Sequence, residues 1–230
     1  MGLHLTRTLV ACLFACIGVT AIAANDIMDT RHIAIAGTGG FVYETCDWPD
    51  AGALRAVVPV AAEDGSYASG VVVDTNRVLT AAHALNPGQH VFVSVEGHFR
   101  RARVIGVDEA TDLAILAVDT ASIKPMKIAS AELSRAQQVW AVGYPRASGM
   151  ATSAGVFTRQ AGVAVHTSAP IDQGHSGGGL LQCANGSYEL AGMLRGYGAY
   201  LSDGRYVRVK NHSVSVAAAT IQQFVTGSSF

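Results

Sequence analysis

IDQGHSGGGL, residues 171–180, places one serine, Ser176, between a histidine and three glycines. A serine hydroxyl is a weak nucleophile at neutral pH, so it needs a base that takes its proton. The carbonyl that it attacks becomes a tetrahedral oxyanion, which backbone N–H groups stabilise when they point at one spot. Because a glycine adopts a positive φ without strain, we expect the N–H groups of Gly174 and Ser176 to form an oxyanion hole.

Two further stretches supply the groups that a nucleophilic serine requires. GVVVDTNRVLTAAHAL, residues 70–85, is an apolar strand that runs through small residues to His83. ATDLAILAVD, residues 110–119, has Asp112 at the head of another apolar strand, where a buried carboxylate needs a hydrogen-bonding partner. A neutral histidine accepts the serine proton, and a carboxylate orients that histidine and stabilises the imidazolium. These patterns predict a catalytic triad of His83, Asp112 and Ser176.

The net charge argues against a nucleic-acid binder, and the pattern of short strands favours an all-β protein. The 230 residues are 50% hydrophobic and 14% charged, with a formal net charge of -1, which argues against nucleic acid or an anionic membrane surface as the main partner. Short runs rich in β-branched residues alternate with Gly, Asn, Asp and Pro, as in a sandwich or a pair of barrels. SVSVAAATIQQFV predicts a closing helix over about residues 213–226.

The first 24 residues have the features of a secretory signal peptide. A cationic start, MGLHLTR, precedes the uncharged run TLVACLFACIGVTAIA, and residues 21–23 offer small side chains for cleavage. We expect residues 1–24 to be removed, the mature protein to be periplasmic or secreted, and no membrane span to remain. Retention as a membrane anchor and lipidation at Cys12 or Cys16 are the alternatives.

Signal removal leaves two of the four cysteines, Cys46 and Cys183. An even pair in an exported protein predicts one disulfide bond, with two buried free thiols as the alternative. We expect no metal and no cofactor. No metal-ligand spacing is present among His90, His98, His166 and His212.

LTAAH, residues 79–83, and GHSGG, residues 174–178, resemble the signatures of trypsin-like serine peptidases. Several stretches, among them TSAPIDQGHSGGGLL, are more similar to the HtrA/Deg branch of that family. The resemblance covers about residues 54–226. It implies two packed six-stranded antiparallel β-barrels, over about residues 54–120 and 137–212, with the triad in the cleft between them.

On this resemblance the chain divides into a signal peptide, an N-terminal extension over residues 25–53, and a protease domain over residues 54–230. The expected activity is that of a serine endopeptidase acting on polypeptide substrates, without the PDZ domain common in that branch. A catalytically silent trypsin-like fold used as a binding module is the alternative, and the oligomeric state is open.

The primary specificity pocket is expected beside the nucleophile. Pro170 stands where trypsin has an acidic residue, so the resemblance argues against cleavage after Lys or Arg. The predicted substrate-binding residues are Pro170, Ile171, Gln173, Met193 and Arg195.

His175 takes the position where trypsin-like zymogens have an Asp that pairs with a newly released N-terminal amine. A neutral histidine has no charge to offer a buried ammonium, so we expect no such insertion. His175 is predicted to turn away from the cleft, with the surrounding turn held by local hydrogen bonds or ordered by substrate.

Overall fold

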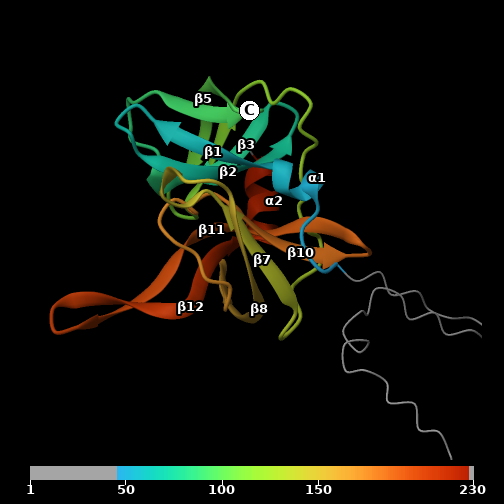
Figure 1. Cartoon of the computed structure of the whole chain (residues 1–230), viewed down its shortest axis with the longest axis vertical. Coiled ribbons are helices and arrows are strands. Elements are labelled where there is room, and N and C mark those ends of the chain that lie inside the picture. The colour runs from blue at the N-terminus through green and yellow to red at the C-terminus, as the bar shows by residue number, and fades with distance from the viewer. Residues whose placement is uncertain (1–45, 228–230) are drawn as a thin grey trace, which may run out of the picture. The chain divides into compact units, whose positions relative to one another are not determined.

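The computed structural model describes residues 46–227, so the predicted signal peptide and most of the predicted N-terminal extension lie outside the described residues. The described residues form two closed six-stranded β-barrels (Figure 1). Neighbouring strands within each barrel are antiparallel, which confirms the predicted fold class. No helix among the described residues is both long enough and apolar enough to cross a membrane.

The first barrel has the strand order β1-β2-β3-β6-β5-β4. Valines fill most of its interior, because alternate residues of a strand point to the same face, as in the buried and half-exposed alternation along β4. Its strands are β1 (Val57–Ala62), β2 (Tyr67–Asp74), β3 (Arg77–Ala81), β4 (Val91–Val95), β5 (His98–Asp108) and β6 (Leu113–Ala117).

The second barrel has the order β10-β11-β12-β9-β8-β7 and closes where β7 pairs with β10. The long hairpin of β11 and β12 projects beyond the barrel at the lower left of Figure 1. Its strands are β7 (Gln138–Gly143), β8 (Ala151–Ala161), β9 (Ala164–Thr167), β10 (Gly179–Ala184), β11 (Ser187–Ser202) and β12 (Arg205–Ala217).

The largest hydrophobic cluster spans both barrels and joins them. It contains Leu79 from the first barrel and Trp140 and Met193 from the second, all essentially without solvent exposure. Burying such large side chains stabilises the fold by about 1.5–3 kcal/mol each. The C-terminal helix α2 (Ala218–Gly227) adds the fully buried Ile221 to this cluster, so it ties the end of the described chain to both barrels.

Two predicted boundaries need correction. The closing helix starts at residue 218 and not at 213, because residues 213–216 pair with β9 as the last part of β12. The alternation of Ser and Val there has the two-residue period of a strand. Helix α1 (Ala51–Arg55) crosses the expected start of the protease domain at residue 54, and the Asp50 carboxylate caps it by accepting from the Ala53 N–H at 2.8 Å.

The predicted disulfide between Cys46 and Cys183 is present, with the two Cα atoms 5.9 Å apart. It ties the segment before α1 to β10 and closes a loop with a sequence separation of 137 residues. A cross-link over so long a loop removes many conformations from the unfolded chain, so it stabilises the folded state.

We predict that replacing both cysteines by alanine lowers the free energy of unfolding by about 2–5 kcal/mol. Urea titration of the oxidised protein, the reduced protein and the Cys46→Ala/Cys183→Ala variant measures this change. Equal stability of all three forms, or two alkylatable thiols in the native non-reduced protein, would contradict the prediction.

Candidate active site

His83 and Asp112 lie side by side because they stand at adjoining ends of two paired strands. Ala81 at the end of β3 pairs with Leu113 at the start of β6. The short 3-10 turn η1 (Ala82–Ala84) follows β3 and carries His83. The backbone N–H of Ala82 donates to the Asp112 carbonyl at 3.1 Å, and this bond fixes the turn against the head of β6.

The Asp112 carboxylate is buried, with an exposed fraction of 4%. The His83 backbone N–H donates to Oδ1 at 2.9 Å, and His83 Nδ1 lies 3.0 Å from Oδ1 and 2.8 Å from Oδ2. Arg195 Nε adds an ion pair to Oδ2 at 3.2 Å. Burial alone would raise the pKa of Asp112, but the hydrogen bonds from His83 and the nearby cationic groups lower the pKa below its usual value. The carboxylate is therefore charged and acts as an acceptor.

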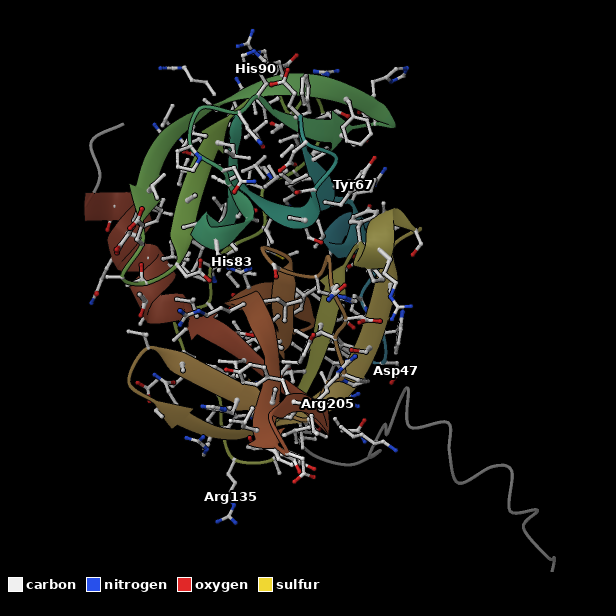
Figure 2. All side chains as sticks on the ribbon, turned by 90° about the vertical axis from the view of Figure 1, so that its left-hand side faces the viewer. Asp47, Tyr67, His83, His90, Arg135 and Arg205 are labelled. Atoms are coloured by element: carbon white, nitrogen blue, oxygen red, sulfur yellow. A yellow bond between two sulfur atoms is a disulfide. The ribbon has the colours of Figure 1, made fainter. Side chains whose placement is uncertain are left out.

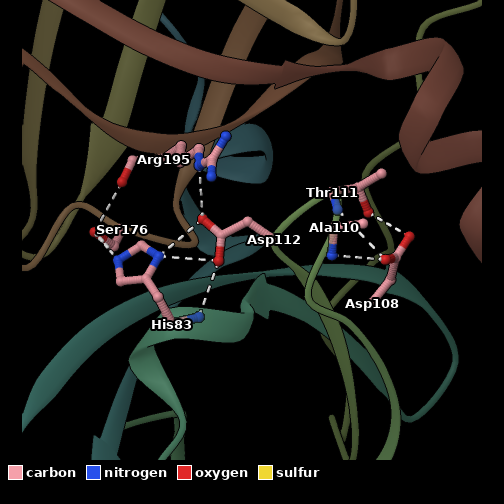
Figure 3. Close-up of polar contacts among 7 residues, drawn as sticks. All are labelled: His83, Asp108, Ala110, Thr111, Asp112, Ser176 and Arg195. Atoms are coloured by element: carbon pink, nitrogen blue, oxygen red, sulfur yellow. Dashed lines mark hydrogen bonds and ion pairs between the residues drawn. The ribbon is translucent and has the colours of Figure 1, made fainter.

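Ser176 completes a line of three polar groups across the two barrels (Figure 3). His83 Nε2 lies 3.1 Å from Ser176 Oγ. Because the Asp112 carboxylate can only accept, Nδ1 carries the imidazole proton and Nε2 is free to accept the serine proton. The Arg195 carbonyl is a second acceptor for the hydroxyl, at the longer distance of 3.3 Å. Figure 2 shows His83 at the border between the barrels, and half of its side chain is exposed to solvent.

The backbone before Ser176 forms a tight turn, which we call the 172–176 turn. The His175 N–H donates to the Asp172 carbonyl at 3.1 Å, and Gly174 has a φ of 95°. A positive φ at this third position is typical of a type II β-turn and favours glycine. A Cβ at Gly174 would also lie 2.6 Å from the Tyr144 carbonyl oxygen, so no side chain fits there.

The first barrel holds the 172–176 turn through Ser69 of β2. Ser69 is fully buried, and its hydroxyl donates to the Gly174 carbonyl at 2.7 Å while accepting from the Tyr144 N–H at 2.8 Å. Its backbone N–H donates to the Ser176 carbonyl at 2.8 Å. Gly177 allows this approach, since a Cβ there would lie 2.1 Å from the Ser69 carbonyl oxygen. The position of the serine is thus determined by the packing of one barrel on the other.

Asp172 anchors the start of the 172–176 turn. Its carboxylate pairs with Arg146 at 2.7 Å and with Arg208 at 3.3 Å. Arg208 also donates to the Ile171 carbonyl, and its guanidinium lies 4.6 Å from the centre of the Tyr197 ring. Contacts within the chain therefore hold the turn.

His175 is buried and does not line the cleft with His83. Its exposed fraction is 4%, and its Nδ1 lies 3.1 Å from the backbone nitrogen of Asp172. Nδ1 also lies 3.1 Å from the Asp172 carbonyl oxygen, and because the Asp172 N–H can only donate, we assign Nδ1 as its acceptor. Burial lowers the pKa of His175, which favours the neutral ring that this contact needs.

A hollow of about 690 Å³ adjoins the triad. Its lining includes Arg195 and Tyr197 of β11, and Leu85 and Pro87 from the first barrel. β11 separates from β10 after Met193, so the edge of residues 195–197 that faces Ser176 has no strand beside it among the described residues. An open strand edge of this kind can pair with an extended peptide.

The predicted substrate-binding residues occupy different surroundings. Pro170 and Gln173 are exposed beside the 172–176 turn, and Arg195 lies in the hollow. Ile171 is 3% exposed and packs in the core of the second barrel. Met193 is a correction: it is fully buried in the cluster between the barrels, where it has no surface to offer a substrate.

No group of three or more His, Cys, Asp or Glu side chains within residues 46–227 is arranged to hold a metal ion.

The sequence profile of the trypsin-like peptidase domain matches residues 68–193, which include His83, Asp112 and Ser176. This match covers more than half of the chain, and the chain belongs to that family. No curated protein matches the sequence.

Solved structures with the same fold include HtrA-type proteases. The serine endoprotease from Yersinia pestis is 23% identical with a TM-score of 0.65, and the match covers 76% of this chain and 62% of that one. The HtrA-type protease AlgW, solved with a tripeptide, is 22% identical with a TM-score of 0.64, over 76% and 60% of the two chains. A protease of M. tuberculosis in an inactive form is 19% identical with a TM-score of 0.64, over 81% and 100%. This chain thus spans less than two thirds of the first two proteins.

We predict that His175 makes the stability depend on pH near neutrality. Its pKa is lower in the folded protein than in the unfolded chain, so the unfolded chain binds a proton first as the pH falls below about 6.5. Stability contributed by the neutral ring is therefore present above that pH and is lost on acidification, by at most about 1.4 kcal/mol per pH unit.

Urea titrations between pH 5 and pH 7.5 measure this dependence. His175→Asn keeps a hydrogen-bond acceptor without a titrating ring, and we expect a flatter profile than in the wild type. His98→Asn is the control because His98 is exposed. Burial also lowers the pKa of His166, so a smaller slope remains in the variant. An unchanged slope in His175→Asn would contradict the assignment.

Proposed function

We propose that this protein is an exported serine endopeptidase, with Ser176 as nucleophile, His83 as general base and Asp112 as the orienting carboxylate. The observation that carries the proposal is the unbroken line of hydrogen bonds from Asp112 through His83 to Ser176 Oγ, at 2.8 and 3.1 Å. Membership of the trypsin-like peptidase family supports it. Export is supported by the signal-like residues 1–24 and by the disulfide bond.

In the proposed acylation step, Ser176 Oγ forms a bond to the substrate carbonyl carbon while its proton passes to His83 Nε2. The carbonyl π electrons move to the oxygen, and Asp112 stabilises the imidazolium. Collapse of the tetrahedral intermediate breaks the C–N bond, and Nε2–H protonates the departing amine. Water then repeats the sequence on the acyl-serine, with His83 again as base, and releases the acid and free Ser176.

We assign the oxyanion hole to the backbone N–H groups of Gly174 and Ser176. The Gln173 carbonyl accepts from the Arg146 N–H at 2.9 Å. Because a trans peptide is planar, the N–H of Gly174 points in the opposite direction, away from Arg146. Neither this N–H nor that of Ser176 donates to an acceptor within the described residues. Two N–H groups left without partners beside the nucleophile are what a developing oxyanion needs.

We propose that an extended polypeptide binds along residues 195–197 and places its scissile carbonyl at Ser176. The hollow beside His83 then receives side chains on the acyl side of the scissile bond, against Leu85, Pro87 and Tyr197. We assign the exposed Pro170 and Gln173 to the entry of the primary pocket. The position of Pro170 carries no acidic group, so cleavage after Lys or Arg is not expected.

Labelling by a fluorophosphonate probe tests the nucleophile. We predict that wild-type protein from residue 25 is labelled and hydrolyses casein, and that Ser176→Ala and His83→Ala lower the turnover number by about 10⁴-fold or more. Asp112→Asn retains a small residual rate. Ser187→Ala, at an exposed position outside the site, is the control. Wild-type turnover by Ser176→Ala, or an unlabelled wild type, would favour the alternative of a silent binding module.

Ser69 tests whether the first barrel positions the oxyanion hole. Ser69→Ala removes the hydroxyl that bridges the Gly174 carbonyl and the Tyr144 N–H and leaves both partly buried groups unpaired, which costs about 1–3 kcal/mol. We expect kcat to fall by about 10- to 100-fold while KM changes little. Ser148→Ala, which removes an exposed serine-to-carbonyl bond nearby, is the matched control. Equal effects of the two substitutions on kcat would contradict this role.

A further inference from the structure

Arg195 contacts the same carboxylate oxygen as the imidazole of His83. Its Nε lies 3.2 Å from Asp112 Oδ2, and His83 Nδ1 lies 2.8 Å from that oxygen. Figure 3 shows the guanidinium and the imidazole reaching the carboxylate from different sides. The backbone of Arg195 belongs to the second barrel, whereas Asp112 and His83 belong to the first. The arginine therefore forms a polar link across the cleft at the carboxylate itself.

The three side chains differ sharply in exposure. The Asp112 side chain is 5% exposed, whereas those of Arg195 and His83 are 47% and 50% exposed. An ion pair between exposed groups contributes little. Here the acceptor is the buried Asp112 carboxylate. If it lost Arg195, part of its negative charge would be left without a partner, which is unfavourable in a buried position. The contact with Arg195 is thus one of the conditions under which Asp112 stays ionised and fixed.

Few other charges face this position. Around the hollow the titratable groups are His83, Asp112, Arg195, the exposed Glu109 and the phenol of Tyr197. Asp108, in the same loop, is directed to the Ala110 and Thr111 N–H groups and to the Thr111 hydroxyl. Of the anionic groups among these, only Asp112 forms an ion pair with the Arg195 guanidinium in the described residues.

We propose that Arg195 is a positioning residue for Asp112, and that its fixed charge extends the activity of the His83–Ser176 pair to lower pH. The inference rests on the proposed function, since it concerns how the base is held. His83 accepts the serine proton only when its ring is neutral. The permanent positive charge of Arg195, which contacts the same carboxylate, opposes a second positive charge on the His83 ring, because like charges repel in a partly desolvated site. Removing the arginine charge should make protonation of the ring easier and inactivate the enzyme at higher pH.

The test is the pH profile of kcat/KM for a peptide ester between pH 4.5 and pH 9. Arg195→Gln removes the charge and is expected to move the midpoint of the acid limb upward by about 0.5–1 pH unit. Arg195→Lys keeps the charge and is expected to keep the wild-type midpoint, with a lower plateau because the Nε contact is lost. Arg135→Gln makes the same change of charge at an exposed position far from His83 (Figure 2) and should match the wild type.

Salt supplies a second measurement that needs no variant. Arg195 is half exposed, so 1 M NaCl, with a Debye length of about 3 Å, screens its charge. We expect the wild-type acid limb to move toward that of Arg195→Gln, and the two profiles to converge in 1 M NaCl. Thermal unfolding of each variant shows whether the fold is retained. If Arg195→Gln does not fold, the inference is tested by the wild-type acid limb, which should move upward in 1 M NaCl, and by Arg195→Lys, which should keep the wild-type midpoint in low salt.

An acid limb of Arg195→Gln that coincides with the wild type in low salt would overturn the inference, and so would equal shifts in Arg195→Gln and Arg195→Lys. Both results leave the wild-type enzyme active, so the proposed function would stand. A wild-type protein that neither turns over the ester nor reacts with a fluorophosphonate would overturn the proposed function, and this inference with it.

Discussion

The contact between Ser69 and the 172–176 turn is the constraint on which the site depends. Ser69 belongs to the first barrel, yet its hydroxyl and its backbone N–H hold the carbonyls of Gly174 and Ser176 in the second. The approach is so close that Gly177 has no room for a side chain. The nucleophile and the base come from different barrels, so their 3.1 Å separation is set by this packing. A shift of one barrel would open the hydrogen bond between His83 and Ser176.

Contacts within the chain hold the region around the nucleophile. Trypsin-like zymogens order this region by burying a new ammonium against an aspartate before the serine. Here His175 is neutral and buried, and the carboxylate lies three residues earlier, at Asp172, where Arg146 and Arg208 pair with it. The ion pairs come from the loop after β7 and from the β11–β12 hairpin. That no N-terminal amine inserts beside His175 stays a prediction.

The sequence predicted the candidate site best where nucleophilic catalysis requires particular residue types close to the end of a strand. His83, Asp112 and Ser176 follow from the histidine after a small-residue strand end, the acid heading an apolar strand, and the glycines around the serine. The link between Arg195 and Asp112 was not predictable, because it depends on where a long side chain points across two barrels. The burial of Met193 is likewise a property of barrel packing. The strand over residues 213–216 was visible as a Ser–Val alternation, which the prediction of a helix from residue 213 overlooked.

The crystal structure of the protein after reaction with a fluorophosphonate tests the central claim most directly. The account predicts a covalent bond from phosphorus to Ser176 Oγ. It also predicts the phosphonyl oxygen within about 3 Å of the backbone nitrogens of Gly174 and Ser176, with the 172–176 turn unchanged. An adduct on another residue would contradict the account. So would a phosphonyl oxygen that reaches neither nitrogen because the turn has rearranged.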